Sequence, residues 1–423
     1  MVETTSAPAP SVAVATRALF LGILLLMLGN GLQGSLLGVR AVAEDFSTVT
    51  TGIVLAGFYV GFLAGSTYTT KALQNVGHIR VFAALASSAS AAVLVHSIWV
   101  HPISWALIRY VTGFCIAGLY IVAESWLNDL ATNETRGRLL SVYMIVTMGG
   151  LGGGQLLLNA ADPTEFQLFV VASVLVSISL VPIALSPASA PPITVPQHLP
   201  FAELREYAPI GIVASFFTGM TNGGYLSVAA VYASSIGMSK SEVSLFVFAA
   251  LTGAMALQFP IGQLSDRIPR RIVMLAVTSI AAGLGIAGAL GPEGGWFSIL
   301  ISFCFGGMIY PFYSLTVAHT NDWVPRDKML GASAKIVLIS GIGAILGPII
   351  LTVSMAVIGD RGFFLALAAI HAVIGLFVAY RLNVRASLGV DEQADFVPVP
   401  ARPTAIVANR LRPSRRPRKS PPR

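Results

Sequence analysis

Twelve long hydrophobic runs follow one another along the chain, separated by short polar segments. Each run is close to the ~20 residues that an α-helix needs to cross the hydrocarbon core of a bilayer. Within the runs the apolar residues are continuous rather than alternating, which favours helices over strands. The pattern therefore predicts an all-α membrane protein with transmembrane helices at residues 18–39, 50–68, 81–100, 103–127, 139–159, 166–185, 208–232, 243–262, 272–291, 296–318, 332–357 and 363–380.

The longest interior polar segment divides the runs into two sets of six. Residues 186–206 hold five prolines, and proline-rich stretches are typical of linkers. The residues after Arg381 combine prolines with many arginines, a composition that cannot bury a core. We therefore expect a cytoplasmic N-terminal tail at residues 1–16, six-helix bundles at 17–185 and 207–381, a cytoplasmic linker at 186–206, and a disordered basic cytoplasmic tail at 382–423.

Short motifs recur between the two sets of runs at an almost constant offset. Asn30-Gly31 recurs as Asn222-Gly223, and the loop at 70–80 recurs at 262–272, both offset by 192 residues. Asn-Asp recurs at 128–129 and 321–322, and glycine-rich stretches recur in the fifth and eleventh runs. Four matches in the same order indicate two homologous halves. An even number of helices per half predicts a parallel repeat, and two such halves can rock about a site between them.

Lys and Arg residues are concentrated in the segments on the side of the N-terminus. Eleven of them lie there before the tail is counted, against Arg40, Lys240 and Arg361 on the other side. By the positive-inside rule both termini are cytoplasmic, and the protein is expected in the cell (inner) membrane. Arg410 to Lys419 is basic enough to contact anionic lipid, although a solvated tail fits equally well.

Composition excludes several classes of protein. Only 11% of the 423 residues are charged and 55% are hydrophobic, whereas soluble domains have about 25% charged residues. The formal charge of +7 does not indicate nucleic-acid binding, because the spans leave no folded basic domain. The sequence has no phosphate-binding loop, no metal-ligand spacing and no visible nucleophile–base pair, so we expect neither an enzyme nor a cofactor. A monomer is expected.

Several motifs resemble those of the major facilitator superfamily. The segment 262–271, G-Q-L-S-D-R-I-P-R-R, resembles the family's signature loop between spans eight and nine, with Pro269 in place of the usual second glycine. The segment 109–118, R-Y-V-T-G-F-C-I-A-G, resembles the fourth-span motif, and 129–137 resembles the loop that follows it. The string A-E-S-W-L-N at 123–128 also resembles a branch of bacterial facilitators that are mainly known as uncharacterised transporters. The resemblance covers the chain except its tails and implies the twelve-helix fold of that superfamily.

The fourth run holds two charged residues, which are costly inside a bilayer and are usually functional. Arg109 lies in the outer half of this run and Glu124 near its inner end, about 22 Å further along at 1.5 Å per residue. The resemblance associates the fourth-span arginine with proton coupling or substrate charge. Glu124 is the only carboxylate inside the predicted spans, and shielding from water raises a carboxyl pKa, so it is a candidate proton carrier. Alternatively, both charges only anchor the helix or order an inner network.

The first-half loop departs from the family signature, because Thr70 and Gln74 replace its Gly and Asp. The resemblance implies that the missing Asp would latch the inner gate at the start of span eleven, where this chain has Lys335. One hypothesis is that Glu124 or Asp129 pairs with Lys335; the alternative is that Lys335 extends to the cytoplasmic surface. The residues expected in proton coupling or gating are Arg109, Glu124, Asp129, Lys335, Asp266, Arg267 and Arg270.

The resemblance implies a substrate cavity lined by spans one, four, seven and ten. Few polar groups in an aromatic wall suit a small, partly apolar ligand. The asparagines that recur at 30 and 222 are the strongest candidates, although each Asn-Gly pair could equally be a helix-packing contact. The predicted cavity residues are Asn30, Gln33, Thr112, Tyr120, Asn222, Tyr225, Phe303, Tyr310 and Tyr313.

We interpret the chain as a secondary active transporter of a small organic solute that works by alternating access. Proton coupling is the favoured mode. Export is favoured over uptake because an aromatic, weakly charged cavity suits amphipathic compounds. The alternatives are an uncoupled facilitator, an uptake carrier, or a non-transporting membrane receptor.

Overall fold

The computed structural model describes residues 12–131, 135–185, 199–325, 327–394 and residue 396. These residues form helices and connecting loops. The first half contains α1 (Val12–Ala43), α2 (Thr48–Val76), α3 (His78–Ile98), α4 (Pro102–Leu130), α5 (Arg136–Leu156), the 3-10 helix η1 (Leu157–Ala160), α6 (Gln167–Ile178) and α7 (Leu180–Ala184). The second half contains α8 (Phe201–Tyr207), α9 (Pro209–Ser235), α10 (Lys240–Ser265), α11 (Arg270–Leu290), α12 (Gly295–Trp323), α13 (Met329–Ile358), α14 (Gly362–Val384) and the 3-10 helix η2 (Val390–Glu392).

Eleven helical spans in the described part of the chain are long and apolar enough to cross a membrane, with α6 and α7 together forming one of them. Helix α9 corresponds to the seventh expected span, which is not among these eleven, and its 27 residues also reach membrane length. Its Thr, Ser, Asn and Gly residues lower its mean hydropathy. Every residue from Thr218 to Ala233 is buried inside the protein, so these polar groups face neighbouring helices rather than lipid.

The two halves pack their helices in the same way, as the sequence repeat predicts. In the first half, a Cβ on Gly31 of α1 would lie 2.3 Å from the carbonyl oxygen of Leu151 on α5. In the second half, a Cβ on Gly223 of α9 would lie 2.8 Å from the Cα of Ala344 on α13. Both Asn-Gly pairs are therefore helix-packing contacts, in which glycine lets two backbones approach closely.

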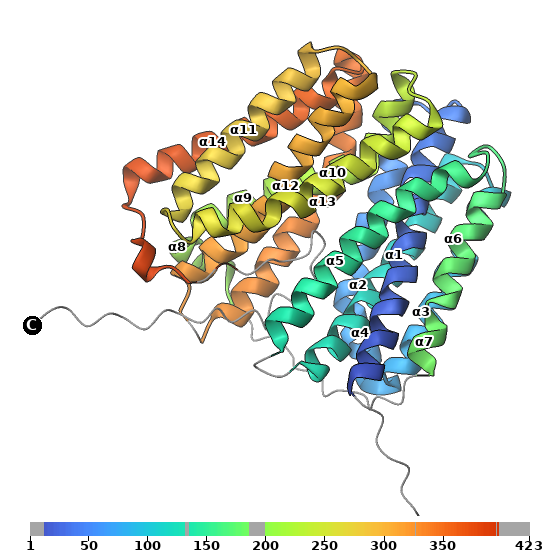
Figure 1. Cartoon of the computed structure of the whole chain (residues 1–423), viewed down its shortest axis with the longest axis horizontal. Coiled ribbons are helices and arrows are strands. Elements are labelled where there is room, and N and C mark those ends of the chain that lie inside the picture. Colours follow the sequence, from blue (N-terminus) through green and yellow to red (C-terminus); the bar gives the residue numbers. More distant parts are fainter. Residues whose placement is uncertain (1–11, 132–134, 186–198, 326, 395, 397–423) are drawn as a thin grey trace, which may run out of the picture.

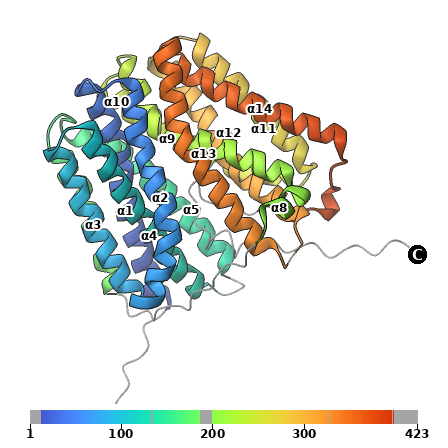
Figure 2. The ribbon, with the colours of Figure 1, turned by 180° about the vertical axis from the view of Figure 1, so that it is seen from behind.

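The halves touch each other at one end and separate at the other (Figures 1 and 2). Successive spans run in opposite directions, so after twelve spans α14 ends on the side of the molecule where α1 begins. We call this side the terminal side. Away from it, α2 packs on α13, where a Cβ on Gly52 would lie 2.9 Å from the carbonyl oxygen of Pro348. Helices α5 and α10 meet toward the top of Figure 1 and diverge toward the terminal side.

Three polar contacts join the halves at the end opposite the terminal side. Asn159 of η1 donates to the hydroxyl of Ser244 at 2.8 Å, and its side-chain carbonyl accepts from Ser241 at 2.9 Å. Lys240 at the start of α10 donates to the carbonyl oxygen of Ala161 at 2.9 Å. We call these contacts the opposite-side latch, because they connect the two halves where the halves are in contact.

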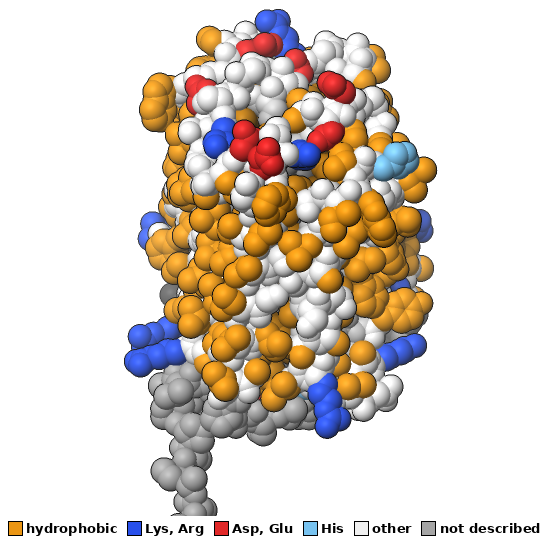
Figure 3. Space-filling model, turned by 90° about the vertical axis from the view of Figure 1, so that its right-hand side faces the viewer, with side chains coloured by type: hydrophobic (Ala, Val, Ile, Leu, Met, Phe, Trp, Pro, Cys, Tyr) orange, Lys and Arg blue, Asp and Glu red, His pale blue; other side chains and the backbone are white. Residues whose placement is uncertain are grey.

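The surface has the banding of a membrane protein. In Figure 3 hydrophobic side chains form a broad belt. Acidic side chains gather above it, together with some Lys and Arg side chains, whereas the charged side chains visible near its lower edge are Lys and Arg. The lower edge is the terminal side, and Lys71, Arg80 and Arg138 are exposed there.

The segments outside the bundles differ in part from the sequence prediction. The predicted linker contains helix α8, whose Glu203 pairs with Lys328 at the start of α13. The hydrogen bonds from Lys328 to Glu203 and to Tyr207 raise the pKa of this lysine. The prediction of disorder from residue 382 is wrong for the first part of the tail, because α14 continues to Val384 and the following residues fold back onto the second half. Residues 1–11, 186–198 and 397–423, including the basic stretch Arg410 to Lys419, lie outside the described residues.

Candidate functional site

Two small cavities lie between the halves near the centre of the molecule. The first, of about 10 Å³, is lined by Asn30, Gly31, Gly34, Arg109, Leu151, Gln155, Leu226 and Ser227, and we call it the arginine cavity. The second, of about 50 Å³, is lined by Asn222 and Tyr310 together with residues of α2 and α13, and we call it the tyrosine cavity. Leu226 of α9 borders both, so the two cavities are neighbours.

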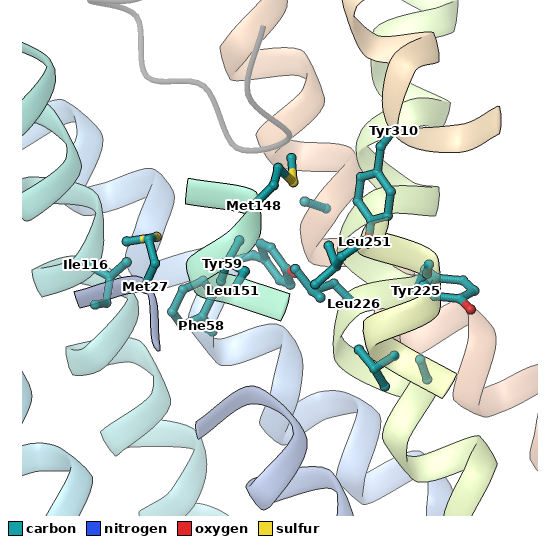
Figure 4. Close-up of a cluster of buried hydrophobic side chains, with 14 of the residues drawn as sticks. Met27, Phe58, Tyr59, Ile116, Met148, Leu151, Tyr225, Leu226, Leu251 and Tyr310 are labelled. Atoms are coloured by element: carbon teal, nitrogen blue, oxygen red, sulfur yellow. The ribbon is translucent and has the colours of Figure 1, made fainter. Parts of the chain in front are cut away.

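Tyr59 of α2 joins the first half to α9 beside these cavities. Its hydroxyl donates to the carbonyl oxygen of Gly223 at 3.0 Å and accepts from Ser227 at 3.3 Å. Figure 4 shows the Tyr59 ring reaching toward Leu226 and Leu251 of the second half. The sequence analysis missed Tyr59, because it expected spans one, four, seven and ten to line the cavity and Tyr59 lies on the second span.

The arginine cavity gathers buried polar side chains from α1, α4 and α5. Arg109 is 4% exposed, and its guanidinium lies 4.5 Å from the centroid of the Phe58 ring. Gln155 donates to the carbonyl oxygen of Gly31 at 3.0 Å and its Oε1 accepts from Ser35. The Nδ2 group of Asn30 has no hydrogen-bond partner among the described residues. The Asn30 amide is therefore a donor for a ligand group that offers a hydrogen-bond acceptor.

Gln155 is a site residue that the sequence analysis did not propose. It occupies the position in α5 that Pro348 occupies in the second half, offset by 193 residues. The sequence feature that could have identified Gln155 is its long polar side chain within an otherwise glycine-rich and apolar span. The structure shows why it matters: the glycines let α1 and α5 approach, and Gln155 then caps a carbonyl of the neighbouring helix.

The tyrosine cavity contains Asn222, the second-half counterpart of Asn30. Asn222 and Tyr310 both line it, and Asn222 Oδ1 has no hydrogen-bond partner within the described structure. Its other walls are mainly apolar or backbone, from Phe62, Leu63 and the glycines of α9 and α13. An aromatic and apolar wall with a few polar groups suits a partly apolar ligand.

Six of the predicted cavity residues do not line either central cavity. Tyr225 is fully buried in the second half, where its hydroxyl lies 2.7 Å from Ser302 and its ring stacks 5.6 Å from Phe305. Figure 4 shows it on the far side of α9 from Tyr59. The aromatic packing of the second half therefore accounts for the burial of Tyr225, and no ligand is needed to explain it. The other five are Gln33, Thr112, Tyr120, Phe303 and Tyr313.

Among these residues, two satisfy their hydroxyls inside the first half. Thr112 donates to the carbonyl oxygen of Arg109 at 3.0 Å, and Tyr120 contacts the Sδ atom of Met27 at 2.7 Å. Both are packed against neighbouring helices, so their polarity reflects internal hydrogen bonding. By contrast, Gln33 Nε2 and Tyr313 Oη are buried without a hydrogen-bond partner among the described residues.

Glu124 lies in a closed environment at the terminal end of α4. Its side chain is fully buried, and Tyr143 of α5 donates to its Oε1 at 2.8 Å. Next to it, Ser125 lies 3.1 Å from the Nε2 of His78. Asp129 is exposed at the end of the helix. In the part of the chain that the structure describes, no ion pair joins Lys335 to Glu124 or Asp129, so this conformation lacks the predicted pairing.

The signature loop of the second half forms a buried ion pair. Arg270 binds the carboxylate of Asp322 and lies 3.5 Å from Asp266, its neighbour one turn earlier. Arg270 and Asp322 are both buried. Helix α12 extends to Trp323, beyond the predicted end of this span at residue 318, so the buried carboxylate of Asp322 also lies within a membrane-length helix, in addition to Glu124. Arg267 is exposed on the terminal side.

A third and larger cavity opens between α5 and α10 on the terminal side, with a volume of about 520 Å³. We call it the α5–α10 cavity. Its lining is formed by Ser141, Met144, Ile145, Met148, Ala254, Met255, Gln258, Phe259, Gly262, Gln263, Asp266 and Phe396. Met148 lies about one helical turn from Leu151, so this cavity begins next to the arginine cavity. Ile145 and Phe259 on its walls are 59% and 70% exposed.

Two repeated six-helix halves, closed together at one end and separated by a cavity at the other, are the architecture of a membrane transporter. The sequence profile of the Major Facilitator Superfamily matches residues 19–210 and again residues 211–418, one match for each half. The chain therefore belongs to this superfamily, whose members are transporters rather than enzymes.

The chain is also similar to individual members of the superfamily. It is 24% identical over 355 residues to the Uncharacterized MFS-type transporter Ent638_1421 of Enterobacter sp. (strain 638), covering 83% of this chain and 92% of that protein. It is 23% identical over 369 residues to the Uncharacterized MFS-type transporter YcaD of Escherichia fergusonii, covering 82% and 91%. The resemblance inferred from the E-S-W-L-N string is consistent with these relatives.

Solved structures share the fold at low sequence identity. The nucleoside transporter NupG superposes with a TM-score of 0.73 at 13% identity, covering 88% of this chain and 100% of that one. A bacterial homologue of the human lysosomal transporter Spinster, in an inward-facing and unoccupied conformation, gives a TM-score of 0.68 at 15% identity, covering 96% and 98%. These likenesses support the twelve-helix fold.

Proposed function

We propose that this transporter moves a small, partly apolar organic solute by alternating access, coupled to protons and in the direction of export. The observation that carries the proposal is the α5–α10 cavity, open on the terminal side, next to central polar groups that both halves contribute. Its volume of about 520 Å³ falls within the ~300–1,000 Å³ of ligand pockets. A solute could move from this cavity to the centre when the halves rock.

The chemistry of the lining supports the substrate class. The α5–α10 cavity is bordered mainly by Met, Ile and Phe side chains, with Gln258 and Gln263 as amide groups. The central cavities add Asn30, Asn222 and Gln155, whose amides both donate and accept. The arginine at 109 favours a ligand with an acceptor or a negative end. An amphipathic solute satisfies both kinds of wall.

The arrangement of charges supports a cytoplasmic terminal side. On the face shown in Figure 3, the charged side chains at the terminal side are Lys and Arg, whereas acidic side chains and some Lys and Arg side chains gather at the other end; this bias agrees with the positive-inside rule. With this orientation the present conformation faces the cytoplasm. The solute would then be taken up from the cytoplasmic side and released outside.

The burial of Glu124 supports a role as proton carrier. A carboxylate that is fully buried in a membrane protein is expensive when it is charged, and Tyr143 can donate to it while it is ionised. If the terminal side closes and the environment of Glu124 changes, its proton affinity changes too. Glu124 could then release a proton in one conformation and bind one in the other.

A ligand screen by thermal shift, run at two pH values on detergent-purified protein, tests the proposal. A small organic ligand raises the melting temperature by mass action, and with wild type we expect a shift that depends on pH. Glu124→Gln should keep the ligand shift and lose its pH dependence. Glu206→Gln, which removes an exposed carboxylate on α8, should behave as wild type.

Transport into proteoliposomes then distinguishes a proton-coupled transporter from an uncoupled facilitator and from a non-transporting receptor. Movement of the ligand that follows an imposed proton gradient in wild type but not in Glu124→Gln supports proton coupling through this residue. Equal transport with and without the gradient would instead identify an uncoupled facilitator. Binding without any transport would favour the receptor and refute the proposal.

A further inference from the structure

The residues after α14 form a strap that lies across the terminal face of the second half. We define the C-terminal strap as residues 385–394 and Phe396. Arg271 donates to the carbonyl oxygen of Arg385 at 2.6 Å, and the Arg385 guanidinium lies 4.0 Å from the Trp323 ring centroid. These contacts fix the beginning of the strap beside the ends of α11 and α12.

The far end of the strap is bound to the charged groups of the signature loop. Arg270 donates to the carbonyl oxygen of Ala394 at 2.7 Å, and the amide of Ala394 donates to Asp322 at 3.0 Å. The amide of Phe396 donates to the carboxylate of Asp266 at 2.9 Å. Backbone hydrogen bonds to ionised groups are among the stronger ones in proteins, so the strap has a defined docking site.

The strap ends at the mouth of the α5–α10 cavity. The ring of Phe396 lies on Gly262 of α10, so closely that a Cβ on that glycine would lie 2.4 Å from the ring. Across the cavity, its lining includes Ser141 and Met144 of α5. Phe396 therefore occupies space on the face of α10 that is turned toward α5.

Closing the terminal side requires α5 and α10 to approach each other there. At the other end they are already close, since a Cβ on Gly152 of α5 would lie 3.1 Å from the ring of Phe248 on α10. A comparable approach at Gly262 is blocked while Phe396 covers this glycine, because packed side chains do not interpenetrate.

We propose that the C-terminal strap is a wedge that holds the terminal side open and must leave Asp266 and Gly262 before the halves can close there. The inference rests on the alternating access proposed above and adds a regulatory element to it. Release of the strap requires the Phe396 amide to leave the carboxylate of Asp266, because this hydrogen bond holds the Phe396 ring on Gly262.

The distance between spin labels at positions 138 and 264 reports the opening of the terminal side. Arg138 on α5 and Leu264 on α10 are both exposed, and the native Cys115 and Cys304 are replaced by serine. Full-length protein should give mainly the long distance. Truncation after Val384 removes the strap and should raise the ratio of short to long distances about tenfold, equivalent to about 1.4 kcal/mol.

Matched variants separate the wedge from general loss of stability. Truncation after Phe396 keeps the strap and should match the full-length distribution. Phe396→Ala removes only the ring, and Gly262→Ala displaces it, so both should shift the ratio in the same direction as removal of the strap. Phe201→Ala, which removes an exposed ring on α8, should have no effect.

The outcomes distinguish this inference from the proposed function. A short-distance population that exists in the full-length protein but does not respond to Phe396→Ala, Gly262→Ala or strap removal refutes the wedge and leaves alternating access standing. The absence of a short-distance population in every variant and with every ligand refutes alternating access itself. If truncation after Val384 yields aggregated protein, the two point variants decide the question.

Discussion

Replacing Gly31 with alanine should destabilise the first half, whereas the same change at Gly34 should not. A Cβ on Gly31 would lie 2.3 Å from the carbonyl oxygen of Leu151, while a Cβ on Gly34, one turn further along α1, meets no atom within 4 Å. A carbonyl oxygen cannot rotate away as a side chain can, so α1 and α5 must separate by roughly 1 Å to restore van der Waals contact.

The cost can be estimated from known overpacked cores. Forcing one extra methyl group into a tightly packed site costs about 1–3 kcal/mol, and here it also weakens the hydrogen bond from Gln155 to the Gly31 carbonyl. Gly34→Ala adds the same atoms and the same helix propensity, so the difference between the two variants isolates the packing.

Thermal unfolding of the detergent-purified variants measures this difference. We expect Gly31→Ala to melt several degrees below wild type and Gly34→Ala to melt at or slightly above it. Gly223→Ala should behave like Gly31→Ala, since its Cβ would meet Ala344 in the equivalent place of the second half. Equal melting temperatures for the variants at 31 and 34 would show that the repeated Asn-Gly motif is not a packing contact.

Two further predictions concern the polar contacts that hold this conformation. Asn159→Ala removes two hydrogen bonds of the opposite-side latch, to Ser244 and Ser241. It should increase severalfold the labelling of a cysteine placed at 231, a position buried against Gly38 of the other half, without lowering the melting temperature. Unchanged labelling would mean that the latch does not hold the halves together. Asp322→Asn leaves Arg270 buried without its closest carboxylate and should cost about 3 kcal/mol of stability. If Asp322→Asn melts like wild type, the remaining contacts of Arg270 to Asp266 and Ala394 are sufficient.

The spans and the repeat could be predicted because they depend on local composition. An apolar run of membrane length has few alternatives to a helix in lipid, since its backbone must satisfy its own hydrogen bonds. Helix α9 is the one expected span that is less apolar than the other eleven. Its Thr, Ser and Asn residues lower its hydropathy, yet its apolar run was still long enough to be predicted as a span, and the structure places it where other helices cover it.

The candidate site was only partly predictable. Asn30, Arg109, Asn222 and Tyr310, all named from the sequence as candidate site residues, line the central cavities. The repeat and the resemblance had placed their helices at the centre. Tyr225, which was also a predicted cavity residue, lines neither of these cavities. One helical turn of polar and aromatic residues does not reveal which side chain faces the other half, and Tyr225 turns into the aromatic core of its own half instead.

The sequence by itself determined which segments cross the membrane, the division into two homologous halves, and the glycines at which helices approach each other. These properties follow from the period and hydrophobicity of single segments. The tertiary structure alone decided which end of the molecule is closed, that Gln155 and Tyr59 belong to the centre, and that the strap docks on Asp266 and Asp322. Those contacts join residues distant in sequence, and only the packing of the helices brings such residues together.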